Sequence, residues 1–272
     1  MTIRTEHSSL RQGLVGAWCP SLGASGLSLI DQSGRGRNGT LVAPSDTSWS
    51  ASGSGVSLAF NGSTQYATLP FSATFGSSAT LSMWVRRDVA SPSSDPTSGF
   101  FNANAADGGQ ETHYPYVGGT AYFRLLRSAR VSFTPLSSVT RTNWHNVTIT
   151  TDGTTYAVYQ GNALAYSTAA EATVSLASPL IVGRSSPTNA YFCAARFDDI
   201  RLYNRALTPA EIRLLASRRG IGLQPLPDRA AGLPRRFSVN VGGTWRSADS
   251  YVNVGGVWKL GQPSVNVAGT WR

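Results

Sequence analysis

Short runs of apolar residues, separated by turn residues, recur along the chain as far as residue 203. Several runs alternate apolar and polar positions with a period of two, which is typical of half-buried β-strands. The runs cover residues 14–18, 56–60, 66–69, 80–85, 144–149, 155–159, 180–182 and 197–203. This number of short strands predicts an all-β sandwich. We expect its core to contain the large side chains Trp18, Phe60, Trp84, Trp144 and Tyr203.

One helix is predicted after the last of these strands. Thr208 suits the N-cap, Pro209 suits the first helical position, and Glu211 completes a capping box. Gly220 follows two arginines and provides a C-terminal signal. The helix is therefore expected over residues 209–219, where it marks the end of the main domain.

The final 36 residues repeat one phrase three times. Trp245, Trp258 and Trp271 recur every 13 residues, each after a Val-Asn-Val triplet and a Gly-Gly or Ala-Gly pair. Each phrase predicts two very short strands around a tight turn. Because such small hairpins are marginal alone, we expect the three tryptophans to mediate assembly. A disordered, glycine-rich end is the alternative, although disordered segments seldom keep tryptophan and valine in fixed register.

The composition agrees with a β-rich protein. Hydrophobic residues make up 41% of the 272 residues, with 28 Gly and 14 Pro, so one large core and an appendage can form. No stretch approaches the ~20 apolar residues of a membrane span, and no signal peptide is visible, so we expect a soluble protein without membrane insertion. Cys19 and Cys193 are predicted to be buried free thiols, and a bridge between the first and last strands is the alternative.

Basic residues gather toward the C-terminus. The formal charge is +9, and between Arg201 and Arg236 eight arginines face two acidic residues. No lysine-rich run or RNA-binding signature accompanies them, so we expect an acidic protein surface as partner and not nucleic acid. The arginines expected to dock are Arg218, Arg219, Arg235 and Arg236.

Four groups of motifs follow one another along the main domain. They are Gly13-Leu-Val-Gly-Ala-Trp18 with Asp31-Gln-Ser-Gly34, Phe60-Asn-Gly-Ser63 with residues 80–85, Trp144-His-Asn-Val147 with Asp152-Gly153, and residues 197–212. Together they resemble the laminin-G-like, concanavalin A-like jelly-roll family. The resemblance implies a jelly-roll sandwich with one short C-terminal helix. The chain departs from the family at residues 194–196, where members often carry glycine.

These signals together predict four segments. They are an N-terminal arm at residues 1–12, the jelly roll at 13–219, a Pro/Arg-rich linker at 220–236 and the three-repeat hairpin tail at 237–272.

Catalytic residues are not expected. His7, His113 and His145 have neither a metal-ligand spacing nor a nucleophile motif. Asp198 and Asp199 are adjacent on one strand and are expected to point to opposite faces, so they do not form an acid–base pair. The sequence therefore predicts a protein that is not an enzyme.

Two kinds of binding site are candidates. The family resemblance implies a structural calcium, with Asp31 and Asp199 as ligands, whereas Asp31 could equally cap its own turn. The segment 91–122 carries Tyr114, Tyr116 and Tyr122, whose aromatic faces suit sugars. Local packing of these tyrosines is the alternative.

The whole chain, a jelly roll followed by a basic linker and a tryptophan-anchored repeat, resembles virion proteins of tailed bacteriophages. The resemblance implies a structural component of the virion: a capsid decoration, head-fibre or tail-associated protein. Its expected partners are other virion proteins and further copies of itself. The alternatives are a carbohydrate-binding adhesin with a cell-surface glycan as partner, or a subunit of an extracellular filament.

Overall fold

The computed structural model describes residues 7–22, 26–43, 48–52, 55–71, 73–87, 99–102, 111–113, 121–127, 129–137, 142–172, 174–176, 179–184, 192–223, 237–241, 244–248, 251–254, 257–260, 266–267 and 270–271. The chain divides into two compact units, mainly Thr5–Gln224 and Pro225–Arg272. The finer segment boundaries at residues 12, 219 and 236 stay predictions.

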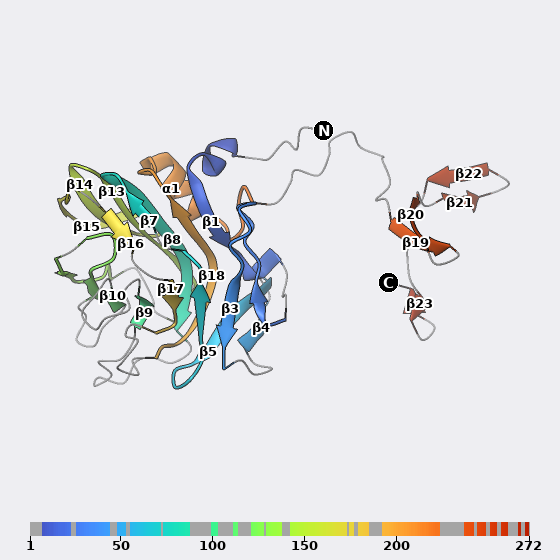
Figure 1. Cartoon of the computed structure of the whole chain (residues 1–272), viewed down its shortest axis with the longest axis horizontal. Helices are drawn as coiled ribbons and strands as arrows, with labels where there is room; N and C mark the ends of the chain where they lie inside the picture. Colours follow the sequence, from blue (N-terminus) through green and yellow to red (C-terminus); the bar gives the residue numbers. More distant parts are fainter. Residues whose placement is uncertain are drawn as a thin grey trace. The chain divides into compact units, whose positions relative to one another are not determined.

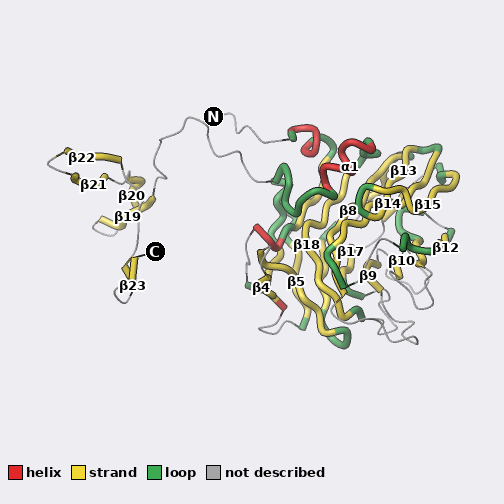
Figure 2. Tube along the Cα trace, turned by 180° about the vertical axis from the view of Figure 1, so that it is seen from behind, coloured by secondary structure: helices red, strands yellow, loops and turns green. Residues whose placement is uncertain are grey.

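Two eight-stranded antiparallel sheets form the larger unit (Figures 1 and 2). Sheet A contains, in spatial order, β15 (Ala163–Ala169), β14 (Thr155–Gln160), β13 (His145–Asp152), β8 (Ser78–Arg87), β18 (Ala194–Tyr203), β5 (Gly55–Asn61) and β4 (Trp49–Ser52), and β1 (Leu14–Trp18) pairs with β18. Sheet B contains β12 (Val131–Phe133), β11 (Ala121–Phe123), β10 (Glu111–His113), β9 (Gly99–Asn102), β17 (Leu180–Val182), β6 (Tyr66–Leu69), β3 (Gly39–Val42) and β2 (Ser28–Leu29). A separate pair joins β7 (Ala73–Phe75) to β16 (Val174–Leu176).

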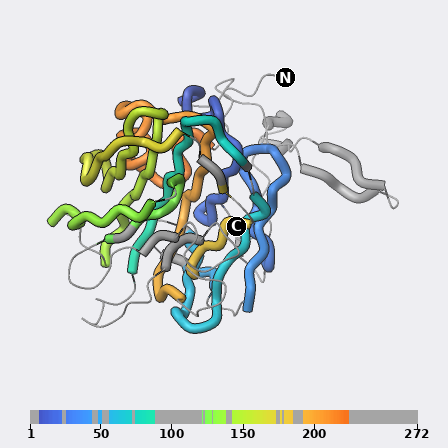
Figure 3. The backbone as a smooth tube through the Cα atoms, turned by 60° about the vertical axis from the view of Figure 1, so that its left-hand side comes forward, coloured from blue at the N-terminus to red at the C-terminus, as the bar shows by residue number. Residues whose placement is uncertain are grey.

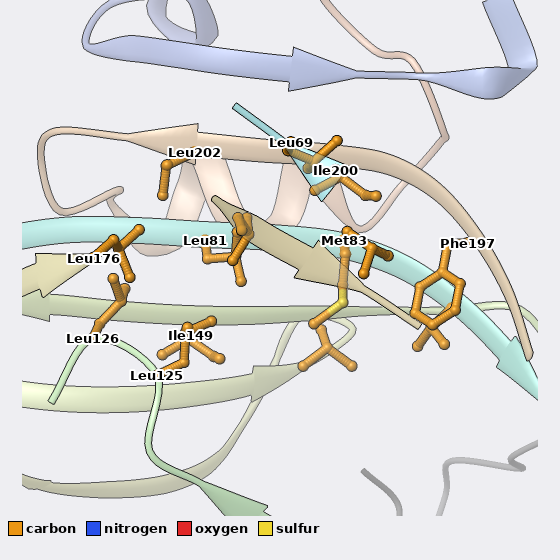
Figure 4. Packing of buried hydrophobic residues seen from close by; sticks show 14 of the residues in the cluster. Leu69, Leu81, Met83, Leu125, Leu126, Ile149, Leu176, Phe197, Ile200 and Leu202 are labelled. Atoms are coloured by element: carbon orange, nitrogen blue, oxygen red, sulfur yellow. The ribbon is translucent and has the colours of Figure 1, made fainter. Parts of the chain in front are cut away.

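Alternate residues of the strands point into the space between the sheets and form the main core. Leu81 and Met83 of β8 and Ile149 of β13 are buried there, and Figure 4 shows them in one cluster with Phe197 of β18. Burial of such aliphatic and aromatic side chains is the main favourable contribution to folding. The period of two in the sequence therefore corresponds to the inner face of each sheet.

The connection between β11 and β12 closes part of this core. Leu125 and Leu126 are almost completely buried, and they lie close to Ile149 and Leu176 in Figure 4. Leu126 has a φ of 60°, in the left-handed region that costs a non-glycine residue about 1 kcal/mol or more. Packing of its side chain holds the backbone in that conformation.

A second apolar cluster covers the outer face of sheet A. It includes Leu10, Leu14, Ala17, Cys19, Tyr203, Leu207, Ile212, Leu215, Ile221 and Leu223. These residues come from the 3₁₀ helix η1 (Ser8–Arg11), β1 and the residue after it, the end of β18, α1 (Pro209–Leu215) and the segments before and after α1. A second 3₁₀ helix, η2 (Pro20–Leu22), follows β1. In Figure 3 the blue N-terminal segment lies beside the orange segment that follows β18. Hydrogen bonds from Arg11 to the carbonyls of Gly222 and Leu223 join the two.

The predicted helix is confirmed at its start and is wrong at its end. Thr208 and Glu211 form the capping box, and Pro209 opens α1. The helix ends at Leu215, four residues before the predicted end, and the chain continues in turns to residue 223. The N–H of Gly220 donates to the carboxylate of Asp199 at 2.8 Å, so a contact with β18, and not a helix C-cap, fixes this glycine.

Strand β18 changes partner in its middle. Its first residues pair with β5 and its last residues pair with β1, while β8 lies along its other side. Between Asp198 and Arg201 the register shifts by a β-bulge, and Asp199 adopts a φ of 47°. A bulge adds a residue and bends the strand, which lets β18 leave one neighbour and join the next.

Three of the five predicted core aromatics, Trp18, Phe60 and Tyr203, are buried. Trp84 and Trp144 are only half-buried, so the prediction is wrong for these two. Trp84 lies on the outer face of sheet A, where its indole N–H donates to the carbonyl of Leu215 at 3.0 Å. The helix, and not the core between the sheets, covers it.

The described residues of the smaller unit form three two-stranded hairpins. They pair β19 (Phe237–Val241) with β20 (Thr244–Ala248), β21 (Tyr251–Val254) with β22 (Val257–Leu260), and β23 (Asn266–Val267) with β24 (Thr270–Trp271). In each hairpin the asparagine of the repeat stands opposite the tryptophan: Asn240 with Trp245, Asn253 with Trp258, Asn266 with Trp271. The predicted hairpin phrase is confirmed. Among the described residues, no helix has the length and apolar character needed to cross a bilayer.

Candidate functional site

Two buried carboxylates lie at the bulge of β18. Asp198 accepts hydrogen bonds from the backbone N–H groups of Ser21 at 3.1 Å and Asp199 at 2.8 Å, and Arg219 pairs with it at 3.0 Å. Asp199 accepts from Nε of Arg201 at 2.6 Å and from Nη2 at 2.9 Å. Burial raises the pKa of Asp198, and the nearby Arg219 opposes that shift.

The prediction that these acids point to opposite faces is wrong. Asp198 contacts Arg219 and Asp199 contacts Gly220, which are neighbours in one turn. The bulge adds a residue, so the alternation of a regular strand does not apply. Since both carboxylates are enclosed and held by donors of the chain, they fasten the turns after α1 to sheet A.

The buried thiol of Cys19 lies beside these carboxylates. Burial, together with the negative charges of Asp199 and Asp198, raises the pKa of Cys19 well above its ordinary value. Cys193 is buried in the main core, and neither cysteine forms a disulfide. The prediction of buried free thiols is confirmed, and the alternative of a bridge is wrong.

Asp31 shapes the turn that follows β2. Its carboxylate accepts from the N–H groups of Ala17, Ser33 and Arg37 and from the hydroxyl of Ser33, at 2.8 to 3.1 Å. Burial alone would raise its pKa, but these hydrogen bonds outweigh burial and lower it. Asp31 therefore caps its own turn, which was one of the two expectations for it.

The contacts of Asp31 and Asp199 differ from those of calcium ligands. The carboxylates of Asp31 and Asp199 face N–H, hydroxyl and guanidinium donors, whereas Ca²⁺ needs six to eight oxygen ligands. The part of the chain that the structure describes holds no group of three or more His, Cys, Asp or Glu placed to bind a metal. These donor-rich surroundings do not suit the ion, and the calcium role stays a prediction from the family resemblance.

An aromatic and arginine cluster lies at one end of sheet B. The guanidinium carbon of Arg184 is 5.3 Å from the ring centre of Tyr66 and 5.2 Å from that of Phe192. The two ring centres are 6.1 Å apart, and all three side chains are half-buried. We call this end of sheet B, defined by Tyr66, Arg184 and Phe192, the rim.

Local structure holds the cluster on both sides. Before Tyr66, the side-chain oxygen of Asn61 accepts from the N–H groups of Ser63 and Thr64, and Gly62 supplies a φ of 73°. Next to Arg184, Gly183 has a φ of 87°, and a Cβ there would lie 2.3 Å from the ring of Phe60. Only glycine fits this position, so the backbone before Arg184 has little freedom.

Strand register brings the predicted sugar-binding segment to the same end of the sheet. Val182 pairs with Ala67 of β6 on one side and with Phe101 of β9 on the other, and His113 of β10 pairs with Gly99. The rim is therefore the end at which β10 finishes and β11 begins. Tyr114 and Tyr116, from the connection between these strands, lie outside the described residues. Tyr122 belongs to β11, but its side chain also lies outside them.

The arginines predicted to dock differ in how far they are exposed. Arg219 is enclosed, with 7% of its side chain exposed, and its guanidinium lies 4.4 Å from the ring centre of Trp144, whereas Arg218 is exposed. Arg235 and Arg236 lie outside the described residues. Trp245, Trp258 and Trp271 are described in their backbones alone. An assembly role for these residues stays a prediction.

No pattern in the sequence predicts the rim cluster. Tyr66 is the first residue of the predicted strand 66–69, but Arg184 and Phe192 are far from it in the sequence and stand in no recognisable pattern. Only the pairing of β6 with β17, and of Arg184 with Phe192, brings the three together. The local signal in the sequence is Gly183, directly after the predicted strand 180–182, because a glycine beside a strand can mark a close approach of another group.

Comparison with protein families gives one match. A laminin-G-like family model, described as the concanavalin A-like lectin/glucanases superfamily, matches residues 61–213. The matched region contains Tyr66, Arg184 and Phe192 and stops before the tail. A search of curated proteins finds no match.

Solved structures of the same fold include one domain of an arabinanase and the binding domains of two other proteins. Domain 4 of AbnA, a GH43 extracellular arabinanase from Geobacillus stearothermophilus, in complex with arabinotriose, has a TM-score of 0.57 and 17% identity, and the match covers 75% of this chain and 98% of that one. The binding domain of Paraclostridial Mosquitocidal Protein 1 has a TM-score of 0.57 and 14% identity, with 93% and 68% covered. The ligand-binding domain of botulinum neurotoxin serotype D, in complex with N-acetylneuraminic acid, has a TM-score of 0.55 and 14% identity, with 76% and 51% covered.

At these identities the likeness concerns the fold, and it confirms the predicted jelly-roll architecture. The chain spans about half the length of the toxin domain that it matches.

Proposed function

Because the chain belongs to the concanavalin A-like lectin/glucanases superfamily, we propose that it is a non-catalytic, lectin-like module that binds carbohydrate at the rim. The observation that carries the proposal is the cluster of Tyr66, Arg184 and Phe192. Half-buried aromatic rings beside hydrogen-bond donors suit sugars, which present C–H groups on their ring faces and hydroxyl groups at their edges. The tyrosines at positions 114, 116 and 122 stay sequence-based candidates for contact with the same ligand.

Two further observations support a binding role. The adjacent acids Asp198 and Asp199 are enclosed and paired, so they offer a substrate neither a free general acid nor a free base. The arabinanase domain was solved with arabinotriose and the toxin domain with N-acetylneuraminic acid. Those ligands belong to those proteins, and they favour carbohydrate as the ligand class for a chain of the same fold without fixing the sugar.

A glycan array probed with the full chain tests the proposal. We expect binding to a subset of glycans that Tyr66→Ala and Phe192→Ala each reduce at least tenfold, because each removes a ring from the cluster. Tyr166→Ala is the matched control, since Tyr166 is also half-buried, its ring centre lies 5.5 Å from that of Phe133, and it belongs to the edge strand β15. Absence of binding to every glycan, or an equal loss in the control, would overturn the proposal.

A second function concerns the tail. The three hairpins share one register and one repeat length, which favours attachment of the chain to a larger assembly through repeated, equivalent contacts. We infer that the chain is a structural component of a tailed-phage virion, with other virion proteins and copies of itself as partners, and that it displays the jelly roll.

Removal of residues 237–272 tests this second function. The truncated chain should keep a cooperative thermal transition and its glycan binding, but it should no longer enter the particle or oligomer that contains the full chain. Normal incorporation of a folded, truncated chain would show that the tail does not attach it.

A further inference from the structure

Each hairpin of the tail is a sheet of two strands with two outer edges. Within the described part of the chain, every strand from β19 to β24 pairs with one neighbour only. The backbone N–H and C=O groups along an open edge can pair with a further strand. A sheet needs three or more strands, or packing against another element, for independent stability. The edges of these hairpins are therefore candidate interaction surfaces.

The two edges of a hairpin differ in charge. The first strands, β19, β21 and β23, contain only Phe, Tyr, Ser, Val and Asn. The second strands β20 and β22 carry Arg246 and Lys259, and Arg272 follows β24. Charged side chains protect an edge against a further strand, whereas an uncharged edge rich in β-branched residues accepts one. The receptive edge of every hairpin is thus its first strand.

The receptive edges are also self-complementary. A strand that pairs antiparallel with its own copy forms a two-fold contact, in which the same residues serve both partners. When β21 pairs in this way about Asn253, Val252 lies opposite the partner's Val254. β-Branched residues then stand opposite one another, and no like charges meet. The asparagine has the same register in all three hairpins, so each offers an equivalent edge.

From these edges we propose that the tail joins two copies of this chain, through antiparallel pairing of first strands between copies. The inference rests on the proposed attachment role of the tail and names a second copy as its partner. Pairing converts two-stranded hairpins into four-stranded sheets, which removes one open edge from each. The net charge of +9 opposes association of two copies, and an uncharged edge is where the least repulsion is added.

Sedimentation velocity of the full chain tests the proposal. We expect a monomer–dimer equilibrium that added salt strengthens, because salt screens the repulsion between two basic copies. Removal of residues 237–272 should abolish the dimer.

Lysines placed on one edge or the other identify the strand that pairs. The disruptive variant carries one lysine in the first strand of each hairpin: Asn240→Lys, Asn253→Lys and Asn266→Lys. The matched control adds the same charge to the second strands: Thr244→Lys, Val257→Lys and Thr270→Lys. The first set should raise the Kd of the dimer about tenfold or more, because like charges then meet across the interface. The second set should change it by about threefold or less, since its charges stay outside the interface.

A single cysteine locates the contact. Oxidation of Asn253→Cys should link two copies, because directly opposed residues of an antiparallel pair lie close to the separation that a disulfide spans. Val257→Cys, on the second strand of the same hairpin, is the matched control and should link at least about tenfold more slowly. Cys19 and Cys193 are buried and do not compete.

Three results would each overturn the inference: a full chain that stays monomeric at every concentration, a dimer that persists without residues 237–272, or equal effects of the two lysine sets. Loss of particle incorporation on truncation would then still support the attachment role, with a different partner. Normal incorporation of the truncated chain refutes that role whether or not copies pair. A thermal melt of each variant confirms that the jelly roll is folded.

Discussion

Arg219 lies 3.0 Å from the carboxylate of Asp198, and both side chains are enclosed by the jelly roll. The same guanidinium covers the ring of Trp144 at 4.4 Å. A residue that the sequence placed in an exposed basic surface thus contributes to the interior, where it offsets the charge of a buried acid. Its exposed neighbour Arg218 has no such role in the described contacts.

Arg219→Gln should therefore destabilise the jelly roll by about 3 to 5 kcal/mol, because it leaves Asp198 buried without its partner. Urea unfolding followed by tryptophan fluorescence measures the change. Arg218→Gln is the matched control and should stay within about 0.5 kcal/mol of the native protein, as exposed substitutions usually do. Adding Asp198→Asn to Arg219→Gln should recover part of the loss. Equal stability of the two single variants would contradict the buried ion pair.

Acid should weaken the start of α1. Arg205 donates two hydrogen bonds to Glu211, at 2.7 and 2.8 Å, and these, with contacts to Thr208, lower the pKa of Glu211 to about 2. A carboxyl whose folded pKa is lowered stabilises the protein above its unfolded pKa, near 4.5, and loses that contribution as the pH falls toward 2.

The contribution of Glu211 amounts to about 2 to 3 kcal/mol, and Glu211→Gln should lose it at pH 6. The free energies of unfolding of the native chain and Glu211→Gln should then converge between pH 4.5 and pH 2. A constant difference between them across this range would show that Glu211 is not ionised and paired as the structure has it.

Gly183 should matter both for stability and for ligand binding. Gly183→Ala places a Cβ 2.3 Å from the ring of Phe60 and forces a positive φ on alanine, so we expect a cost of about 2 to 4 kcal/mol and weaker glycan binding through the displaced Arg184. Gly161→Ala is the control, because Gly161 has a φ of 63° but no atom within 4 Å of the added carbon. It should cost about 1 kcal/mol and leave binding intact. Similar effects of the two changes would contradict the close approach at Phe60.

Neither thiol should react in the native protein. Cys19 is enclosed, and burial with two nearby carboxylates raises its pKa, which disfavours the reactive thiolate. Cys193 is buried in the main core. Titration with a thiol-specific disulfide reagent should therefore report two reactive groups in guanidinium chloride and none before unfolding. Rapid native labelling of one cysteine would place it at the surface.

Local signals predicted local structure well. The capping box of Thr208 and Glu211 lies within four residues, and the hairpin phrases each lie within nine, so the sequence alone specifies them. The Asx turn of Asp31 has the same character, since its carboxylate bonds Ser33 two residues later. Such features need no knowledge of the rest of the chain.

Features that depend on distant partners were missed. The helix ends at Leu215 because the turns after it are held by the bulge of β18, through Gly220 and Arg219, and no pattern near residue 215 records that contact. The bulge itself depends on β18 having two successive neighbours. The rim cluster combines residues from β6 and from the segments that follow β17 and precede β18, and only the sheet brings them together.

The change of partner along β18 also has a consequence for synthesis. β1, β5 and β8 all pair with β18, yet they are made long before it, since β18 begins at residue 194. While the chain leaves the ribosome, the edges of β5 and β8 that will receive β18 stay open, and open edges attract foreign strands. Sheet A closes only when the last strand of the jelly roll arrives. We therefore expect a late, chaperone-sensitive step in the biogenesis of this protein, set by the order in which its strands are translated.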